Sequence, residues 1–212
     1  MLIKSAQAGQ GFVISESIKE AWKVFKKDWI LVLAVQLLPI AVAIVFTMFT
    51  NDADQESSLS IVLTLAYLLV QLVVSMGVIK AYLNITRGKK VTKETFTSQF
   101  PNILSYLAAQ ILMILIILGG FILLIIPGFY FSLKFMFTPY LVIDKKMGPI
   151  EALKASGKIT HGIKWDIVGF MVATTLLMYS GVLALGVGLI VTIPVATLAY
   201  TVLYNRVVKR LK

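Results

Sequence analysis

The sequence contains no cysteine, a single histidine and few charged residues. The absence of cysteine excludes disulfides, thiolate catalysis and cysteine-based zinc sites, and one histidine leaves little for an imidazole-based metal site. Charged residues make up 14% of the 212 residues and hydrophobic residues 58%, whereas soluble domains carry about 25% charged residues. Because so few polar side chains cannot cover a water-soluble globule of this size, we expect a membrane protein.

Acidic residues are scarce as well, with 10 against 20 basic residues and a net charge of +10. None of the acids lies inside a long apolar run, which argues against a proton relay or a Na⁺ ligand of the usual pump type. The motifs of serine hydrolases, P-loop NTPases, zinc proteases and dinucleotide-binding enzymes are absent. We therefore expect a protein that is not an enzyme, with no catalytic residue, no metal and no cofactor.

Six apolar stretches are long enough to cross a bilayer as helices, since the hydrocarbon core takes about 20 residues. They predict an all-α bundle of six transmembrane helices that forms a single domain over residues 1–212. The six stretches are 30–50, 59–83, 103–118, 121–143, 167–185 and 189–204. Pro39, Pro127 and Pro194 lie inside them and predict helix kinks.

The third and fourth stretches run together, so the turn between them has to be placed within an apolar sequence. Gly119-Gly120 is the turn that we favour, and Pro127-Gly128 is the alternative. The last two stretches have a matching arrangement, in which Gly186-Val187-Gly188 precedes Pro194. Two glycine turns, each followed by a proline-kinked helix, are the simpler interpretation.

Eighteen of the 20 basic residues lie in four segments, which precede the first stretch and follow the second, fourth and sixth. The other three connections hold none. Because basic residues gather on the cytoplasmic side of membrane proteins, both termini are predicted to be cytoplasmic. The charge then indicates attraction to anionic membrane lipids on the cytoplasmic side, with no role in binding nucleic acid.

Three of the basic segments, 15–29, 92–100 and 149–165, also place apolar residues at helical spacing, as in amphipathic helices that lie in the headgroup layer. Each precedes two crossings, which suggests three repeats of the same orientation: 15–83, 92–143 and 149–204. The helix ends support this, because 82–87 resembles 140–145, and both resemble the sequence from Tyr200 onward. The residues expected at the membrane interface are Trp22, Phe25, Trp29, Trp165, Lys19, Lys23, Lys26, Lys27, Lys154 and Lys158.

Lys134 lies inside the fourth stretch, nine residues from its cytoplasmic end, which is about 14 Å along a helix. No Asp or Glu inside the membrane can pair with it, so we favour the anionic group of a ligand as its partner. With the turn at Pro127-Gly128, Lys134 would instead extend to the outer surface. Gln36, Gln71 and Gln110, one on each of the first three helices, are further ligand-site candidates, although hydrogen bonds between helices explain them as well.

Residues 120–131 read GFILLIIPGFYF and are followed by Pro139, by residues 148–156 (GPIEALKAS) and by Trp165. This pattern resembles a group of bacterial integral membrane proteins, which includes the YciC-type inner-membrane proteins and the membrane domain of some glycerophosphoryl diester phosphodiesterases. The resemblance implies a multi-pass protein of the bacterial cytoplasmic (inner) membrane. In such phosphodiesterases the catalytic residues belong to a separate soluble barrel, which 212 residues cannot also hold.

These features favour a non-enzymatic membrane protein that binds, moves or organises a lipid-like or small anionic molecule. The alternative is a structural or accessory membrane subunit that docks a partner protein through its basic cytoplasmic helices. A homo-oligomer is compatible with either function.

Overall fold

The computed structural model describes residues 10–50, 58–183 and 188–211, and within these ranges it contains helices and no strand. The helices are α1 (Gln10–Thr50), α2 (Ser58–Thr86), α3 (Lys93–Thr97), α4 (Ile103–Leu123), α5 (Ile125–Phe135), α6 (Thr138–Lys145), α7 (Pro149–Ile159), α8 (Lys164–Leu183) and α9 (Leu189–Val207), with short 3₁₀ helices η2 (Phe100–Asn102) and η3 (Val208–Leu211). Gly186 and Val187 of the predicted second turn lie outside the described residues.

Six spans are apolar and long enough to cross a membrane, as the sequence predicted. They are Ile14–Met48, Leu59–Thr86, Lys93–Leu123, Ile125–Lys145, Lys164–Leu183 and Leu189–Leu211. The protein is therefore all-helical with the helices of a multi-pass membrane protein.

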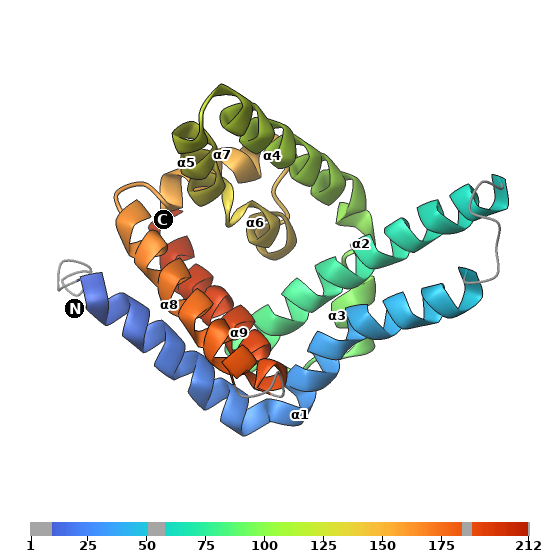
Figure 1. Ribbon diagram of the computed structural model, residues 1–212, viewed down its shortest axis with the longest axis horizontal. Coiled ribbons are helices and arrows are strands. Elements are labelled where there is room, and N and C mark those ends of the chain that lie inside the picture. The colour runs from blue at the N-terminus through green and yellow to red at the C-terminus, as the bar shows by residue number, and fades with distance from the viewer. Residues whose placement is uncertain (1–9, 51–57, 184–187, 212) are drawn as a thin grey trace.

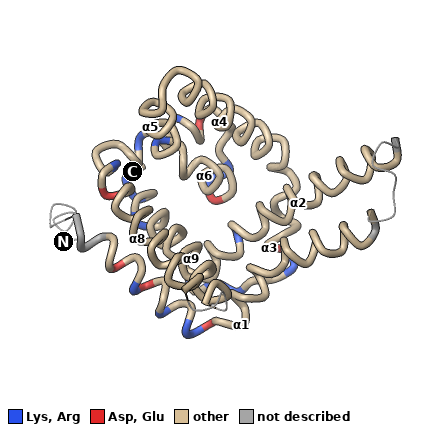
Figure 2. The backbone as a smooth tube through the Cα atoms, viewed as in Figure 1, with Lys and Arg blue, Asp and Glu red and all other residues tan. Residues whose placement is uncertain are grey.

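The helices are arranged around α6, which lies in the centre of the view in Figure 1 and packs against α2, α4 and α7. α8 and α9 run side by side, and α1 packs on both. The second half of α1 and α2 form a hairpin that projects to the right of the view. In Figure 2 the projecting hairpin and α4 are almost free of charge, whereas lysines and acidic residues alternate along the first half of α1.

The helix α1 is interrupted at Asp28, whose backbone angles (φ −124°, ψ 32°) are not helical. The interruption separates a basic first half from an apolar second half. Ala21 and Phe25, four residues apart, are buried in the core, so the first half packs on the bundle. Phe25, expected at the membrane interface, therefore faces the core instead, whereas Trp22 and Trp29 are exposed.

The chain reverses at Leu124, whose backbone is extended, and not at either of the predicted turns. Gly120 is part of α4, and a Cβ atom on it would lie 2.9 Å from the Cα atom of Gly128 in α5. The glycine thus allows two helices to approach closely. Pro127 lies in the first turn of α5, where the missing N–H has no helical acceptor, so it begins a helix and does not kink one.

The predicted fourth helix, 121–143, is divided into α5 and α6. Ser156 of α7 stabilises the break, because its Oγ donates to the carbonyl of Lys134 (2.8 Å) and accepts from the N–H of Phe137 (3.3 Å). Lys134 consequently lies in the last turn of α5, and not in the middle of an unbroken span. The other two predicted kink residues, Pro39 and Pro194, lie inside α1 and α9.

Arg87 joins three helices that are distant in the sequence. Its Nη2 donates to Oδ2 of Asp144 in α6 (2.9 Å) and to Oδ1 of Asn205 in α9 (2.7 Å). The hydroxyl of Tyr204 donates to the same Asp144 oxygen (3.0 Å). Hydrogen bonding to Asp144 raises the pKa of Arg87 above its ordinary value, so the guanidinium stays charged. We refer to these residues as the Arg87–Asp144 cluster.

Two further arginines connect the end of α9 and η3 to other helices. Arg206 pairs with Glu16 (2.8 Å) and Glu20 (2.7 Å) of α1. Arg210 donates to the carbonyl of His161, just after α7 (3.2 Å). Every ion pair in the described part of the chain uses an arginine, and the lysines there form none. The ammonium groups of the described lysines are therefore available to bind other anionic groups.

Candidate anion-binding site

Three helices bring basic side chains together around Lys134. Tyr130 and Lys134 lie one turn apart on helix α5, and α7 and α8 both pack on α5. Lys164 is the first residue of α8. The aliphatic chain of Lys134 lies against Gly157 of α7, since a Cβ atom on that glycine would be 2.9 Å from Lys134 Cε. Gly157 is part of a continuous α7, and its lack of a side chain makes room for the lysine.

The ammonium groups of this region lie over aromatic rings. Lys164 Nζ is 3.5 Å from the centre of the Tyr130 ring. Lys134 Nζ is 5.2 Å from the centre of the Phe135 ring and 6.0 Å from that of Phe131. The Tyr130 phenol interacts electrostatically with both lysines. Cation–π contacts of this kind hold an ammonium group in place without neutralising it.

Helix α7 adds two more cations. Lys154 and Lys158 are exposed and four residues apart, so they share the face of α7 that contains Gly157. The nearest acids along the chain, Glu151 and Asp166, form no ion pair among the described residues, and Oδ1 of Asp166 lacks a hydrogen-bond partner there. Four lysines thus outnumber two acids. We define the cationic site as Lys134, Lys154, Lys158 and Lys164.

Exposed apolar side chains border the cationic site. Trp165 follows Lys164 directly and is 80% exposed. Ile126 and Phe129, in the first turns of α5, are exposed as well. Cations beside uncovered aromatic and aliphatic groups form a surface suited to an amphiphile, with the charge at one end and the chain at the other.

The three predicted glutamines do not join this site. Gln36 accepts a hydrogen bond from the hydroxyl of Tyr82 (2.7 Å), and thereby joins α1 to α2. Gln71 donates to the carbonyl of Pro39 (3.0 Å), which joins the same two helices. Gln110 donates to a tyrosine of its own helix (3.4 Å). Gln36 and Gln71 are thus occupied in packing between helices, whereas the buried Oε1 of Gln110 has no hydrogen-bond partner among the described residues; none of the three bonds involves Lys134.

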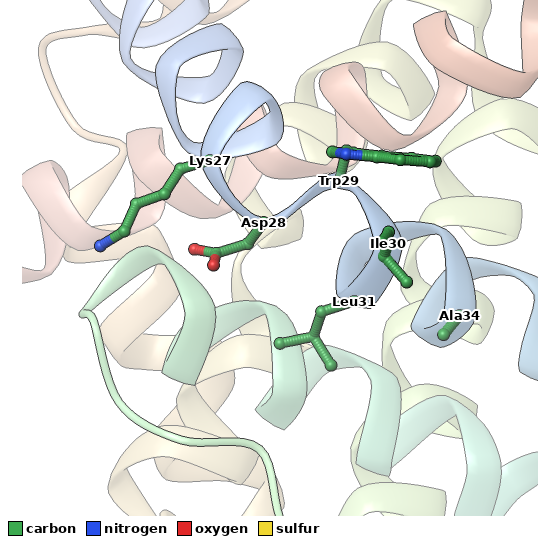
Figure 3. A pocket seen from close by; sticks show the side chains of 6 residues that line it. All are labelled: Lys27, Asp28, Trp29, Ile30, Leu31 and Ala34. Atoms are coloured by element: carbon green, nitrogen blue, oxygen red, sulfur yellow. The ribbon is translucent and has the colours of Figure 1, made fainter.

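A surface hollow of about 370 Å³ lies at the interruption of α1. Figure 3 shows Lys27 and Asp28 projecting from the same side of the kink, with Trp29, Ile30 and Leu31 following them. The described residues that line it all belong to α1. Since no other helix contributes to it, the hollow marks the boundary between the basic and apolar halves of α1 and does not enclose a ligand.

Tyr130, Gly157 and Lys164 were not among the residues predicted for the ligand site. The spacing of Tyr130 and Lys134, four residues apart, is a local signal that could have paired them. Gly157 and Lys164 belong to other helices, and only the tertiary contacts bring them to Lys134.

Among curated proteins, the chain is 26% identical over 225 aligned positions to uncharacterized protein Rv2560 of Mycobacterium tuberculosis, covering 92% of this chain and 69% of that protein. Uncharacterized protein Mb2590 of Mycobacterium bovis matches with the same identity and coverage. No known protein family and no solved structure matches the chain. The chain is thus similar along most of its length to mycobacterial proteins, while the resemblance to YciC-type proteins stays an expectation from its sequence pattern.

Proposed function

We propose that this protein binds anionic amphiphiles, lipid-like molecules with a negatively charged head, without catalysing a reaction on them. The observation that carries the proposal is that Lys134 of α5 lies against α7, whose Lys154 and Lys158 are exposed, and that Lys164 of α8 lies over Tyr130 of α5, with none of these lysines in an ion pair among the described residues. Each ammonium group near a negatively charged head contributes about 1 kcal/mol of attraction. Trp165 and Phe129 are exposed on the membrane-crossing spans of α8 and α5, so the chain of the bound molecule would lie along them.

The proposal places the cationic site, both termini and the first half of α1 on the cytoplasmic side of a bacterial inner membrane. It is supported by the distribution of basic residues, because the cytoplasmic leaflet is rich in anionic lipids. On this orientation the exposed lysines of α1, on the face opposite Ala21, meet the headgroup layer.

We also propose that the fold consists of three repeats of the same orientation, each an interfacial segment followed by two crossings. The segments 82–87, 140–145 and 200–205 each begin with tyrosine and end the second crossing of their unit. Five of the six residues at their fifth and sixth positions are joined by hydrogen bonds, four in the Arg87–Asp144 cluster and Thr86 through Asn205. The residues concerned are Thr86, Arg87, Asp144, Tyr204 and Asn205. Contact between equivalent positions is what a threefold arrangement of repeats produces.

Native mass spectrometry of the protein purified in mild detergent tests the binding of anionic amphiphiles. We expect anionic phospholipid to stay bound to the natural protein in preference to zwitterionic phospholipid. Changing all four lysines of the cationic site to glutamine should lower the retained anionic lipid by roughly tenfold or more, because each charge contributes about 1 kcal/mol.

A matched control removes the same charge from α1, by changing Lys19, Lys23, Lys26 and Lys27 to glutamine. This variant should keep most of the retained lipid, because the α1 lysines contact the headgroup layer of a bilayer, which detergent replaces during purification, and they lie on a different helix from the cationic site. Loss of lipid to the same extent in both variants, or no retained anionic lipid in the natural protein, would contradict the proposal. An acidic protein retained in place of lipid would instead favour the alternative, a subunit that docks a partner.

A further inference from the structure

We propose that the cationic site recognises a phosphate monoester, the head group of a phosphatidate-type lipid, in preference to the phosphodiester heads of other anionic phospholipids. The inference rests on the proposed function, and it adds the chemical class of the head group.

The charge of the site fits a monoester better than a diester. A phosphate monoester carries about −1.5 to −2 at neutral pH, because its second proton dissociates near pH 6. A diester carries a single negative charge. The cationic site offers four ammonium groups without an ion-pair partner among the described residues. The second negative charge of a monoester can therefore pair with a further ammonium group of the site.

The donors also approach from different helices. Lys134 comes from the end of α5, and Lys164 comes from the start of α8 beside the Tyr130 phenol. A monoester presents three unesterified oxygens as hydrogen-bond acceptors, and each lysine ammonium has three donors. A diester has one acceptor oxygen fewer of this kind, and its second substituent occupies the direction that the third oxygen takes in a monoester.

The position of Lys134 is fixed before any ligand binds. Its side chain lies against Gly157, and its carbonyl accepts hydrogen bonds from Ser156 (2.8 Å) and Thr160 (3.3 Å) of α7. Both of these hydroxyl-bearing residues are buried. Because the backbone and the aliphatic chain of Lys134 are already placed, less conformational entropy is lost when its ammonium group binds, which favours selectivity for one head group.

The membrane-crossing spans indicate a lipid as the source of the monoester. Lys134 lies in the span Ile125–Lys145, and Lys164 begins the span Lys164–Leu183. A phosphatidate places its monoester at the end of two acyl chains, so it can reach cations that are carried by membrane helices. We therefore commit to a lipid, and free phosphate esters become an outcome of the test.

The test titrates the detergent-solubilised protein with phosphatidate and with phosphatidylglycerol near neutral pH, and counts the bound lipid by native mass spectrometry. We expect phosphatidate to bind about tenfold more tightly. The double variant Lys134→Met/Lys164→Met should reduce this preference to about twofold or less. Methionine keeps the length of the side chain against Gly157, and circular dichroism verifies that the helices are retained.

The matched control Lys19→Met/Lys23→Met removes two charges from α1 and should keep the full preference. Equal affinity of the natural protein for the two lipids would overturn the inference and leave the proposed function intact. Binding of neither lipid would contradict the proposed function itself. If the double variant Lys134→Met/Lys164→Met keeps the preference for phosphatidate over phosphatidylglycerol, the preference does not come from the cationic site. Displacement of phosphatidate by glycerol 3-phosphate at a similar concentration would overturn the assignment to a lipid.

Discussion

Replacing Arg87 with methionine is expected to lower the free energy of unfolding by about 3–5 kcal/mol, because it leaves a buried carboxylate without its cation. The Asp144 side chain is 5% exposed and its remaining side-chain donor is the hydroxyl of Tyr204. Titration of the detergent-solubilised protein with a denaturing detergent, followed by circular dichroism, measures the loss.

The reverse change, Asp144→Asn, is expected to cost less, about 1–3 kcal/mol. The Arg87 side chain is 30% exposed and can be hydrated when its partner is lost, and asparagine still accepts from Tyr204. The double variant Arg87→Met/Asp144→Leu, which removes both charges, should be more stable than Arg87→Met alone. A larger loss in Asp144→Asn than in Arg87→Met would contradict this account of the cluster.

Alanine at the neighbouring positions Gly119 and Gly120 is expected to change stability in opposite directions. At Gly120 the added Cβ atom would lie 2.9 Å from the Cα atom of Gly128 and 2.9 Å from a ring carbon of Phe131. Because a backbone atom cannot rotate away, α4 and α5 must separate, at a cost of about 1–3 kcal/mol. Gly119 has nothing within 4 Å of its added Cβ atom. There, alanine should stabilise the helix by about 0.5–1 kcal/mol.

The same detergent denaturation compares the two variants, and each serves as the control for the other. If the chain turned at Gly119-Gly120, as the sequence favoured, both alanines would lie in the turn. Helix packing would then give no reason for one alanine to stabilise the protein and the other to destabilise it. Destabilisation of equal size at both positions would therefore contradict the reversal at Leu124.

The number of membrane helices could be predicted because each apolar run of about 20 residues is a local property of the sequence. The reversal at Leu124 could not be predicted, because glycine occurs both where two helices pack closely and where the chain turns. The local sequence does not distinguish the two cases. Which function Gly120 has depends on Gly128 in the partner helix. The break after α5 was also missed, since the side chain that stabilises it, Ser156, lies 22 residues after Lys134.

The candidate site was predicted in part for the same reason. Lys134 was identified because a lysine in a long apolar run is rare, and that signal needs no tertiary contact. Its neighbours on α7 and α8 were assigned to a general membrane surface or not assigned at all. The sequence could not choose between the two interpretations of Gln36 and Gln71, because a polar side chain that joins two helices and one that contacts a ligand have the same local sequence signature.

The contacts of Arg206 have a consequence for biosynthesis. This arginine is 190 residues after Glu16, its partner in α1. At about 5–20 residues per second, the ribosome needs roughly 10–40 s to make the intervening chain. During that interval Glu16 and Glu20 of α1 cannot form their ion pairs with Arg206. Asp144 likewise cannot accept its hydrogen bond from Tyr204, which is 60 residues later in the chain. The contacts between α1 and α2, such as the Tyr82–Gln36 hydrogen bond, need no later helix, whereas the contacts of α9 with α1 and α6 can form only when α9 has been translated.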